Sequence, residues 1–237
     1  MSKTIFVAGV HGGVGQSLAN QLINDGYKVI GSARGISKVD LDLEEVIELD
    51  VLDEASVKPA LEKLSQYDIG GFAYCIGSIV LKPFASANID DFKQAYDLNV
   101  LGAVRLMKGL AGNLKRNEGS VVLFSTIAAR NGFSNHSVIA SAKGAVEALG
   151  LSLAADYAPD IRVNVIAPSL TETPLAQMIT KSEQMVASIS KMHPIPRLGQ
   201  AQDLSNMAEF LLSEKSGWIT GQVIHIDGGR STIRTKG

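Results

Sequence analysis

Three spaced glycines near the N-terminus, Gly9, Gly13 and Gly15, lie between a strand-like run and a helical run. Glycines at such a turn let a pyrophosphate approach the backbone N–H groups at the start of the helix, where the helix dipole favours an anion. The loop therefore predicts a dinucleotide site that includes these glycines and Val14. An ordinary turn that needs positive φ is the alternative interpretation.

The end of the second predicted strand carries information about which nicotinamide cofactor binds. A carboxylate there binds the adenosine ribose and repels a 2′-phosphate, whereas an arginine pairs with that phosphate. Residues 31–34 read Gly-Ser-Ala-Arg, so Arg34 is present and an acid is not. This favours NADP(H) over NAD(H), with a solvated surface arginine as the alternative. Asp50 and Val51, after the third strand, are expected to frame the adenine, although Asp50 also suits a helix cap.

The spacing of the histidines and the cysteine in the sequence does not indicate a metal site. The four histidines are scattered without metal-ligand spacing, so we predict no catalytic metal. Cys75 is the single cysteine, which excludes an internal disulfide and fits a reducing compartment. We expect it to be a small buried apolar side chain.

Short β-rich runs alternate with longer helical patterns along the whole chain. The expected strands are residues 5–8, 28–32, 46–49, 72–75, 121–124, 161–167 and 223–226. This alternation predicts an α/β fold, a Rossmann-like doubly wound sheet of about seven mainly parallel strands with helices on both faces. Residues 34–46 leave room for a single helical turn at most, and the long mixed segment 168–196 predicts a mobile lid. We expect one domain over residues 1–237.

Composition excludes several classes of function. Lysine and arginine total 22 against 24 acidic residues, a formal net charge of −2, which excludes the electrostatic signature of nucleic-acid or anionic-membrane binding. The chain starts directly in a strand-like run rather than a signal peptide. We found no apolar stretch that approaches the roughly 20 residues needed to cross a bilayer. A cytoplasmic location is the resulting expectation.

Further motifs occur in the order seen in the short-chain dehydrogenase/reductase family. The matching residues are Gly9, Gly13 and Gly15; Asn99; Ser141-Ala142-Lys143; the run Arg162 to Pro168; Glu172-Thr173; Trp218 to Gln222; and Asp227-Gly228-Gly229. The chain is therefore identified as a member of this family, over nearly its whole length. The resemblance implies an NAD(P)-dependent oxidoreductase that acts on a small molecule and assembles as a homodimer or homotetramer.

The resemblance also implies roles for individual residues. Asn99 falls at the family's active-site asparagine, and Lys143 falls at the lysine that binds the nicotinamide ribose. The other cofactor contacts that it implies are Gly77, Pro168, Thr171 and Thr173. Gly102, Ala103 and Val104, with the apolar helix after Ser137, correspond to the faces through which family members assemble, although core packing inside one monomer explains much of the same pattern.

Two positions depart from the family's catalytic pattern. Counting back from Lys143, the position of the catalytic tyrosine holds Ile139, and the position of the serine holds Thr126. The tyrosine normally supplies or removes the proton on the substrate oxygen, and isoleucine does neither. General acid–base catalysis contributes about 10²–10⁴-fold, so ordinary carbonyl reduction needs a replacement for the missing group.

Three hypotheses follow. In the first, a small carbonyl substrate is reduced with a proton from His136, while Thr126 hydrogen-bonds the substrate oxygen. In the second, a conjugated enone or imine accepts the hydride, and Thr126 and Asn99 stabilise the charge that develops. In the third, the chain is catalytically silent and binds the nucleotide as a sensor or partner subunit. A surface or capping histidine is the alternative for His136, and a core position at helical spacing with Ala142 is the alternative for Ile139.

Overall fold

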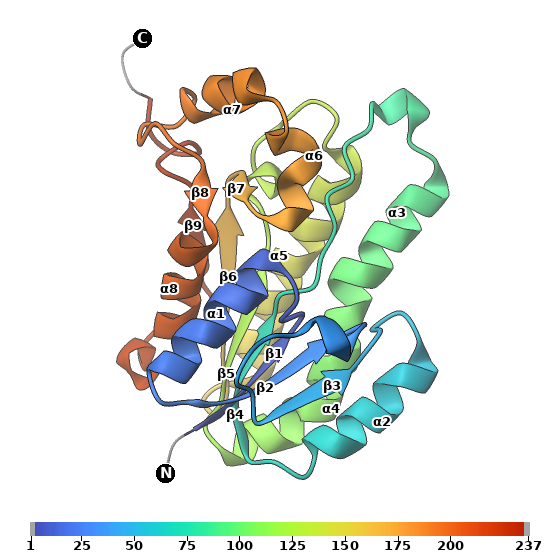
Figure 1. Cartoon of the computed structure of the whole chain (residues 1–237), viewed down its shortest axis with the longest axis vertical. Coiled ribbons are helices and arrows are strands. Elements are labelled where there is room, and N and C mark those ends of the chain that lie inside the picture. The colour runs from blue at the N-terminus through green and yellow to red at the C-terminus, as the bar shows by residue number, and fades with distance from the viewer. Residues whose placement is uncertain (1–2, 235–237) are drawn as a thin grey trace.

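The computed structural model describes residues 3–234, except the side chain of Lys38. Seven strands form one sheet in the order β3-β2-β1-β4-β5-β6-β9 (Figure 1). They are β1 (Thr4–Ala8), β2 (Lys28–Ala33), β3 (Glu45–Glu48), β4 (Ile69–Tyr74), β5 (Ser120–Phe124), β6 (Arg162–Pro168) and β9 (Val223–Ile226). All neighbouring pairs are parallel, so the predicted Rossmann-like fold is confirmed.

The sequence forms this sheet because its strands are apolar enough to be covered on both faces. Every residue of β1 and β4 is buried, as in the centre of a parallel sheet. The order reverses between β1 and β4, which are neighbours although β2 and β3 come between them in the chain. Such a switch point opens a crevice at the carboxyl ends of the strands, where α/β proteins bind ligands.

Helices cover the two faces of the sheet as separate layers (Figure 1). On one face, α1 (Gly13–Asn24) packs beside α8 (Ala201–Leu212), and both share an apolar cluster with Ile5 and Val7 of β1. On the other face, α2 (Glu54–Leu64), α4 (Gly102–Arg116) and α5 (Ser137–Tyr157) share a cluster with Phe6. Burying each large apolar side chain contributes about 1.5–3 kcal/mol, so successive residues of β1 hold the two layers to the sheet.

The connections contain shorter elements. They are η1 (Ile36–Lys38), η2 (Phe84–Ser86), α3 (Ile89–Tyr96), the π-helical turn η3 (Asp97–Leu101), η4 (Ile127–Ala129), β7 (Thr171–Glu172), η5 (Pro174–Ala176), α6 (Gln177–Thr180), α7 (Glu183–Ser190), β8 (Gly199–Gln200) and η6 (Glu214–Ser216). The single turn η1 agrees with the prediction for residues 34–46. The expected lid, residues 168–196, contains α6 and α7, which lie beyond the end of β6 (Figure 1).

The prediction that no apolar stretch approaches the length needed to cross a bilayer is wrong for helix α5. It has 21 residues with a mean hydropathy of 1.4 over its most apolar window, so by length and composition it passes as a membrane span. It also packs against β6 and carries two buried charged residues, Lys143 and Glu147. The core helix of a globular domain meets the same criteria, and this packing fits that interpretation.

The prediction that Gly102 and Ala103 present an assembly face is wrong. Both residues are buried within the monomer. A Cβ atom on Gly102 would collide with the hydroxyl of Tyr74 and would lie 2.9 Å from Cγ2 of Val51. Glycine is needed there because α4 approaches β4 and the β3–α2 loop closely.

Candidate active site

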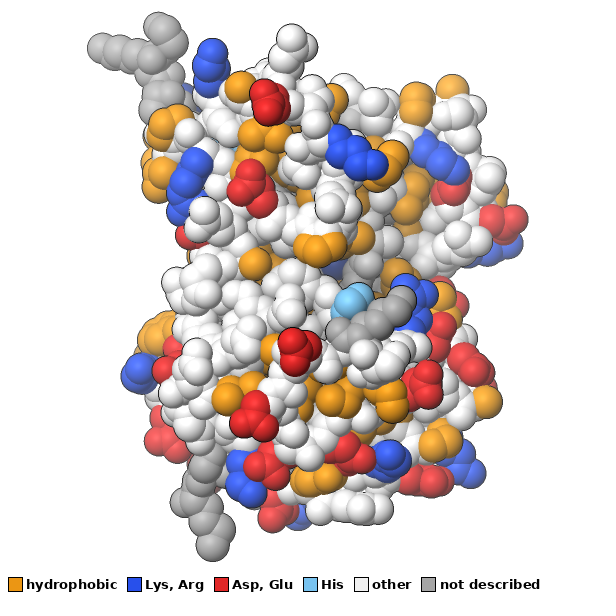
Figure 2. Space-filling view, viewed as in Figure 1, with side chains coloured by type: hydrophobic (Ala, Val, Ile, Leu, Met, Phe, Trp, Pro, Cys, Tyr) orange, Lys and Arg blue, Asp and Glu red, His pale blue; other side chains and the backbone are white. Residues whose placement is uncertain are grey.

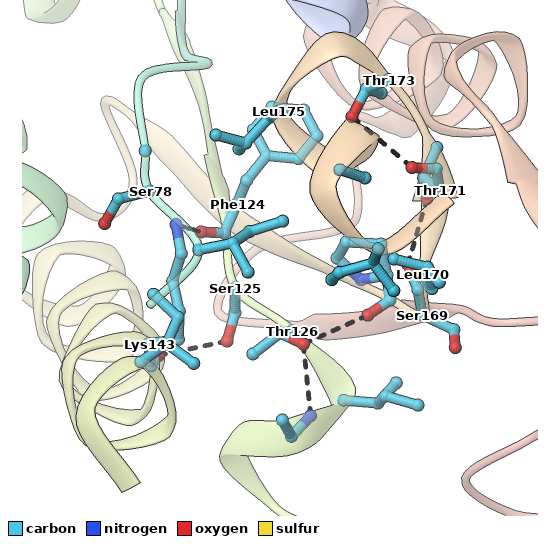
Figure 3. A pocket seen from close by; sticks show the side chains of 18 of the residues that line it. Ser78, Phe124, Ser125, Thr126, Lys143, Ser169, Leu170, Thr171, Thr173 and Leu175 are labelled. Carbon is cyan, nitrogen blue, oxygen red and sulfur yellow. Dashed lines mark hydrogen bonds between the residues drawn. The ribbon is translucent and has the colours of Figure 1, made fainter. Parts of the chain in front are cut away.

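A cavity of about 390 Å³ lies at the carboxyl edge of the sheet, bounded by the segments that follow β4, β5 and β6 and by the start of α5 (Figure 3). Eight residues predicted for the site line it: Val14, Gly77, Thr126, His136, Lys143, Pro168, Thr171 and Thr173. The fold therefore brings together residues that are distant in the sequence. The remaining predicted residues lie elsewhere along the same edge.

Lys143 projects from α5 into the base of the cavity and is 8% exposed. Its Nζ donates to the carbonyl oxygen of Phe124 at 2.8 Å, as Figure 3 shows. Burial lowers the pKa of Lys143 to about 8, although the nearby Cys75 acts in the opposite direction. Burial of the Cys75 thiol likewise raises its pKa to about 12, so it stays protonated. The residue as a whole is half-buried and lines the cavity, so the prediction of a buried apolar side chain holds only in part.

Asn99 lies next to the amine of Lys143 rather than on the cavity wall. It sits in the π-helical turn η3, and its Nδ2 donates to the Ala95 carbonyl at 2.8 Å and to Ser78 Oγ at 3.2 Å. A Cβ atom on Gly77 would lie 3.0 Å from Oδ1 of Asn99 and 3.3 Å from Nζ of Lys143. The carbonyl oxygen and the amine therefore face one small space, which the absence of a side chain at Gly77 leaves open.

Two adjacent hydroxyl side chains after β5 have different roles. Ser125 is buried and donates to Oε1 of Glu147 at 2.9 Å, and that carboxylate also accepts from Nε of Arg130 at 2.7 Å. Thr126 caps η4 by accepting from the Ala128 N–H at 3.3 Å, and its Oγ1 lies 3.5 Å from the carbonyl oxygen of Pro168 (Figure 3). Thr126 is thus the hydroxyl less committed to internal contacts.

His136 and Ile139 line the cavity at the start of α5. Nδ1 of His136 is 2.7 Å from the carbonyl oxygen of Ser134, which only accepts, so Nδ1 carries a hydrogen. Nε2 then accepts in the neutral ring and donates in the protonated one. Ile139 is 5% exposed and belongs to the cavity wall rather than to an apolar core cluster, unlike Ala142. No tyrosine occurs among the described residues that line the cavity.

The glycine loop forms a close turn between β1 and α1. Gly9 has φ +92°, and a Cβ atom on Gly15 would collide with the Gly9 carbonyl oxygen. The N-cap of α1 is Gly12, which has no side chain to accept from the first-turn N–H groups. A helix start with this composition is suited to an anion such as pyrophosphate.

Arg34, Asp50 and Val51 lie at the carboxyl ends of β2 and β3, outside the cavity lining. Arg34 is exposed, whereas Val51 is buried and its carbonyl accepts from Nη1 of Arg105 at 3.2 Å. The alternative that Asp50 caps a helix is wrong. Asp50 accepts from the Leu52 N–H within a turn, and Asp53 caps α2.

Sequence reasoning missed several residues of the site. Ser169, Phe133 and Arg230 line the cavity, and the Arg230 guanidinium lies 4.9 Å from the centroid of the Phe133 ring. Arg230 directly follows a matched C-terminal motif, but no spacing rule indicated that its side chain would turn back to the carboxyl edge.

The residues at this edge fit a dinucleotide. The buried polar atoms without a hydrogen-bond partner in the described part of the chain include two at the carboxyl edge next to the glycine loop and Lys143: Oγ of Ser32, at the end of β2, and Oδ1 of Asn99. The glycine loop borders the first of them, because Gly9 and Val10 donate to the Ser32 carbonyl at 3.0 and 3.1 Å. Ligand hydroxyl or amide groups would supply the missing partners.

The parallel sheet, its switch point and the glycine loop define the class of Rossmann-like dinucleotide-binding proteins. A family model described as "Enoyl-(Acyl carrier protein) reductase" matches residues 9–231. The chain belongs to the short-chain dehydrogenase/reductase family of oxidoreductases.

Known relatives match this chain over nearly their whole lengths. The chain is 30% identical to 7alpha-hydroxysteroid dehydrogenase of Escherichia coli, covering 96% of this chain and 93% of the relative. The structure of ligand-free aldohexose dehydrogenase from Thermoplasma acidophilum superposes with a TM-score of 0.91 at 27% identity. The match covers 100% of this chain and 98% of the dehydrogenase chain. ElxO, solved with NADP bound, has a TM-score of 0.89 at 27% identity, with coverages of 97% and 99%.

Proposed function

We propose that this protein is an NADP(H)-dependent oxidoreductase that transfers hydride between nicotinamide and a small carbonyl or conjugated enone or imine substrate, without a tyrosine acid. One observation supports this most directly. The cavity gathers Lys143, Thr126 and His136 around Ile139, and no tyrosine lines it among the described residues.

The chain's own residues hold the cofactor along the carboxyl edge. In this proposal Gly9, Gly13, Val14 and Gly15 bind the pyrophosphate at the start of α1, and Asp50 and Val51 lie beside the adenine. Lys143 binds the ribose hydroxyls next to the nicotinamide, while Gly77, Pro168, Thr171 and Thr173 line its pocket. The bound cofactor would supply the hydride.

His136 and Thr126 would handle the substrate oxygen. Thr126 Oγ1 donates a hydrogen bond to the carbonyl oxygen and orients it. Nε2 of protonated His136 transfers its proton to that oxygen as the carbonyl carbon gains hydride, and the neutral ring is left hydrogen-bonded to the Ser134 carbonyl. In the oxidation direction the neutral ring accepts the proton.

For a conjugated substrate, hydride supplied by the bound cofactor would leave negative charge on a remote oxygen or nitrogen. A hydrogen bond from Thr126 would stabilise that charge, and Asn99, which lies behind the cavity wall, would contribute through a water molecule. Solvent would then protonate the neighbouring α-carbon of an enone, or the nitrogen of an imine. Reduction of a conjugated substrate by this route needs no acid at position 139.

We also propose a preference for NADP(H), cytoplasmic location and assembly as a homodimer or homotetramer. Arg34 is exposed at the end of β2, where a 2′-phosphate would be reached. Exposed apolar side chains on α3 and η3, Tyr96 at 43% and Leu101 at 38%, offer surface for a second copy.

The test is NADPH oxidation against panels of ketones, enones and imines, with cofactor affinity measured in parallel. We expect turnover of at least one panel, and we expect Lys143→Ala to weaken NADPH binding. If NADPH binds and no compound in any panel is reduced, the catalytically silent sensor or partner subunit becomes the better account.

A further inference from the structure

Arg230 brings a positive charge into the cavity from the C-terminal part of the chain. Its Nη1 donates to Ser169 Oγ at 3.3 Å and its Nη2 to the Met192 sulfur at 3.5 Å. The guanidinium also lies over the Phe133 ring. These contacts fix the direction of the side chain but use weak acceptors, and a guanidinium has five N–H groups to donate.

The carboxylate closest in sequence, Asp227, acts on Arg230 through its negative charge but forms no ion pair with it. Asp227 accepts from the Gly229 and Ser231 N–H groups, each at 2.9 Å, and from the Ser231 hydroxyl. Arg230 forms no ion pair within residues 3–234. The described lining of the cavity contains no aspartate or glutamate, while it contains lysine, histidine and this arginine. The charged groups facing the cavity therefore favour an anion.

A short network holds the guanidinium in place. Nδ1 of the buried His193 is 2.8 Å from the Ile189 carbonyl oxygen, so in the neutral ring Nε2 accepts from the Ser169 hydroxyl, also at 2.8 Å. The lone pairs of Ser169 Oγ then remain to accept from Arg230. Ser169 also follows Pro168, whose carbonyl oxygen lies 3.5 Å from Oγ1 of Thr126. The guanidinium and the hydroxyl that orients the substrate thus contact adjacent residues of one segment.

We propose that Arg230 binds a carboxylate of the substrate, so that the preferred substrates are oxo acids or unsaturated acids. This rests on the proposed oxidoreductase function and adds its substrate class. The planar guanidinium matches a carboxylate through paired hydrogen bonds. Apolar side chains of Leu170, Leu175 and Ile179 line the same cavity and suit an aliphatic chain between the carboxylate and the reacting carbon.

A purely structural role predicts a different outcome. Arg230 joins Met192, two residues after the end of α7, to Phe133, so its loss could loosen the lid segment. A loosened lid segment would weaken the binding of acids and of their neutral analogues equally. Only a carboxylate-binding role changes the selectivity between them.

The kinetic test compares pyruvate, acetoacetate and levulinate with their methyl esters in NADPH oxidation. We expect the best acid to exceed its ester at least tenfold in kcat/KM, mainly through a lower KM. Arg230→Gln should reduce that preference by about tenfold or more, the effect of losing a charge-assisted pair. Arg230→Lys, which keeps the charge, should retain part of the preference for acids over esters. Arg116→Gln, an exposed arginine on α4, is the matched control.

Equal kcat/KM for acids and esters in the unaltered protein, or an unchanged ratio in Arg230→Gln, overturns the assignment. A binding measurement separates this result from failure of the proposed function. Hexanoate is titrated calorimetrically into the NADPH-loaded protein, and we expect Arg230→Gln to bind it at least tenfold more weakly. If no substrate is turned over but this difference is found, the carboxylate site stands and the oxidoreductase proposal fails. If hexanoate binds neither protein, or both equally, the carboxylate site is overturned.

Discussion

Lys143 is a buried amine next to a space bounded by Gly77 and Asn99. Burial disfavours its charged form, and the Phe124 carbonyl is its single hydrogen-bond partner within the described residues. A cofactor ribose would supply further oxygen acceptors, so binding should stabilise the ammonium form. The protein without cofactor therefore holds a charge that is costly until the ligand arrives.

The pH dependence of stability tests this cost. The pKa of Lys143 falls from 10.5 to about 8 on folding, so between these values the unfolded chain binds a proton that the folded one does not. Stability of the cofactor-free protein from this group therefore rises with pH through that window. At pH values below this window, burial of the charged amine lowers the free energy of unfolding by about 3 kcal/mol. In urea unfolding, the gain in stability of Lys143→Met over the unaltered protein should shrink as pH rises, and a constant gain would contradict the assignment.

His136 is expected to be the proton donor. His136→Ala should lower turnover of carbonyl substrates more than tenfold, because general acid catalysis contributes about 10²–10⁴-fold. The pH dependence of kcat should flatten in the variant, which a structural histidine would not cause. Ser134→Ala is the control, since Ser134 is exposed on the same loop and contacts His136 through its backbone carbonyl alone. Unchanged turnover in His136→Ala would remove this residue from the mechanism.

Ile139 occupies the cavity wall four residues before Lys143. Ile139→Tyr would place a phenol on the same helix as the amine, which lowers the pKa of such a hydroxyl when charged. We expect reduction of simple ketones to rise at least tenfold, measured as kcat with saturating NADPH. Ile139→Phe, which adds the ring without the hydroxyl, should show no such gain. If neither variant gains activity, the cavity is shaped for a different proton route.

At the scale of elements, the glycine loop depends on contacts too close for any side chain. Gly15→Ala would press a methyl group against the Gly9 carbonyl, whose carbon would be 2.9 Å away. We expect the start of α1 to shift, with NADPH affinity reduced at least tenfold by calorimetry. Gly144→Ala is the matched control, because its Cβ meets nothing within 4 Å and alanine favours a helix by about 1 kcal/mol. Unchanged NADPH affinity in Gly15→Ala would argue against pyrophosphate binding at this loop.

The elements were predictable because their signal is local. Each strand is a short apolar run, and a run such as 121–124 lacks the room to be a helix; the observed β5 differs from it by one residue. The side chains of the site were predictable only where a motif fixed them. Arg230 and Ser169 were missed, since the direction in which a loop side chain points depends on packing against segments far away in sequence. Gly102 was misassigned for the same reason: its partner is Tyr74, on another element.

At the scale of the whole molecule, the carboxyl edge of the sheet and the predicted lid, residues 168–196, contact each other. A Cβ atom on Gly13 would lie 3.0 Å from Cβ of Thr173, so the glycine loop touches the segment after β6. Arg230 joins Ser169 to Met192 across the lid. Charged side chains of both signs are interspersed on the face shown in Figure 2. That face and the formal net charge of −2 give no general positive field, so in our proposals an anionic ligand is recognised by individual groups, Arg34 and Arg230.

Cofactor binding should therefore stabilise the whole fold, and Arg34 should decide which cofactor does so better. A ligand at a hundred times its Kd stabilises the folded state by about 2.7 kcal/mol, which raises Tm by roughly 5–10 °C for a domain of this size. We expect this shift with NADPH and a smaller one with NADH at equal concentration, by differential scanning fluorimetry. Arg34→Ala should narrow the difference by lowering the NADPH shift, while Arg116→Ala should leave both shifts unchanged. A larger shift with NADH in the unaltered protein would reverse the cofactor assignment, because the 2′-phosphate would then find no favourable partner at the end of β2.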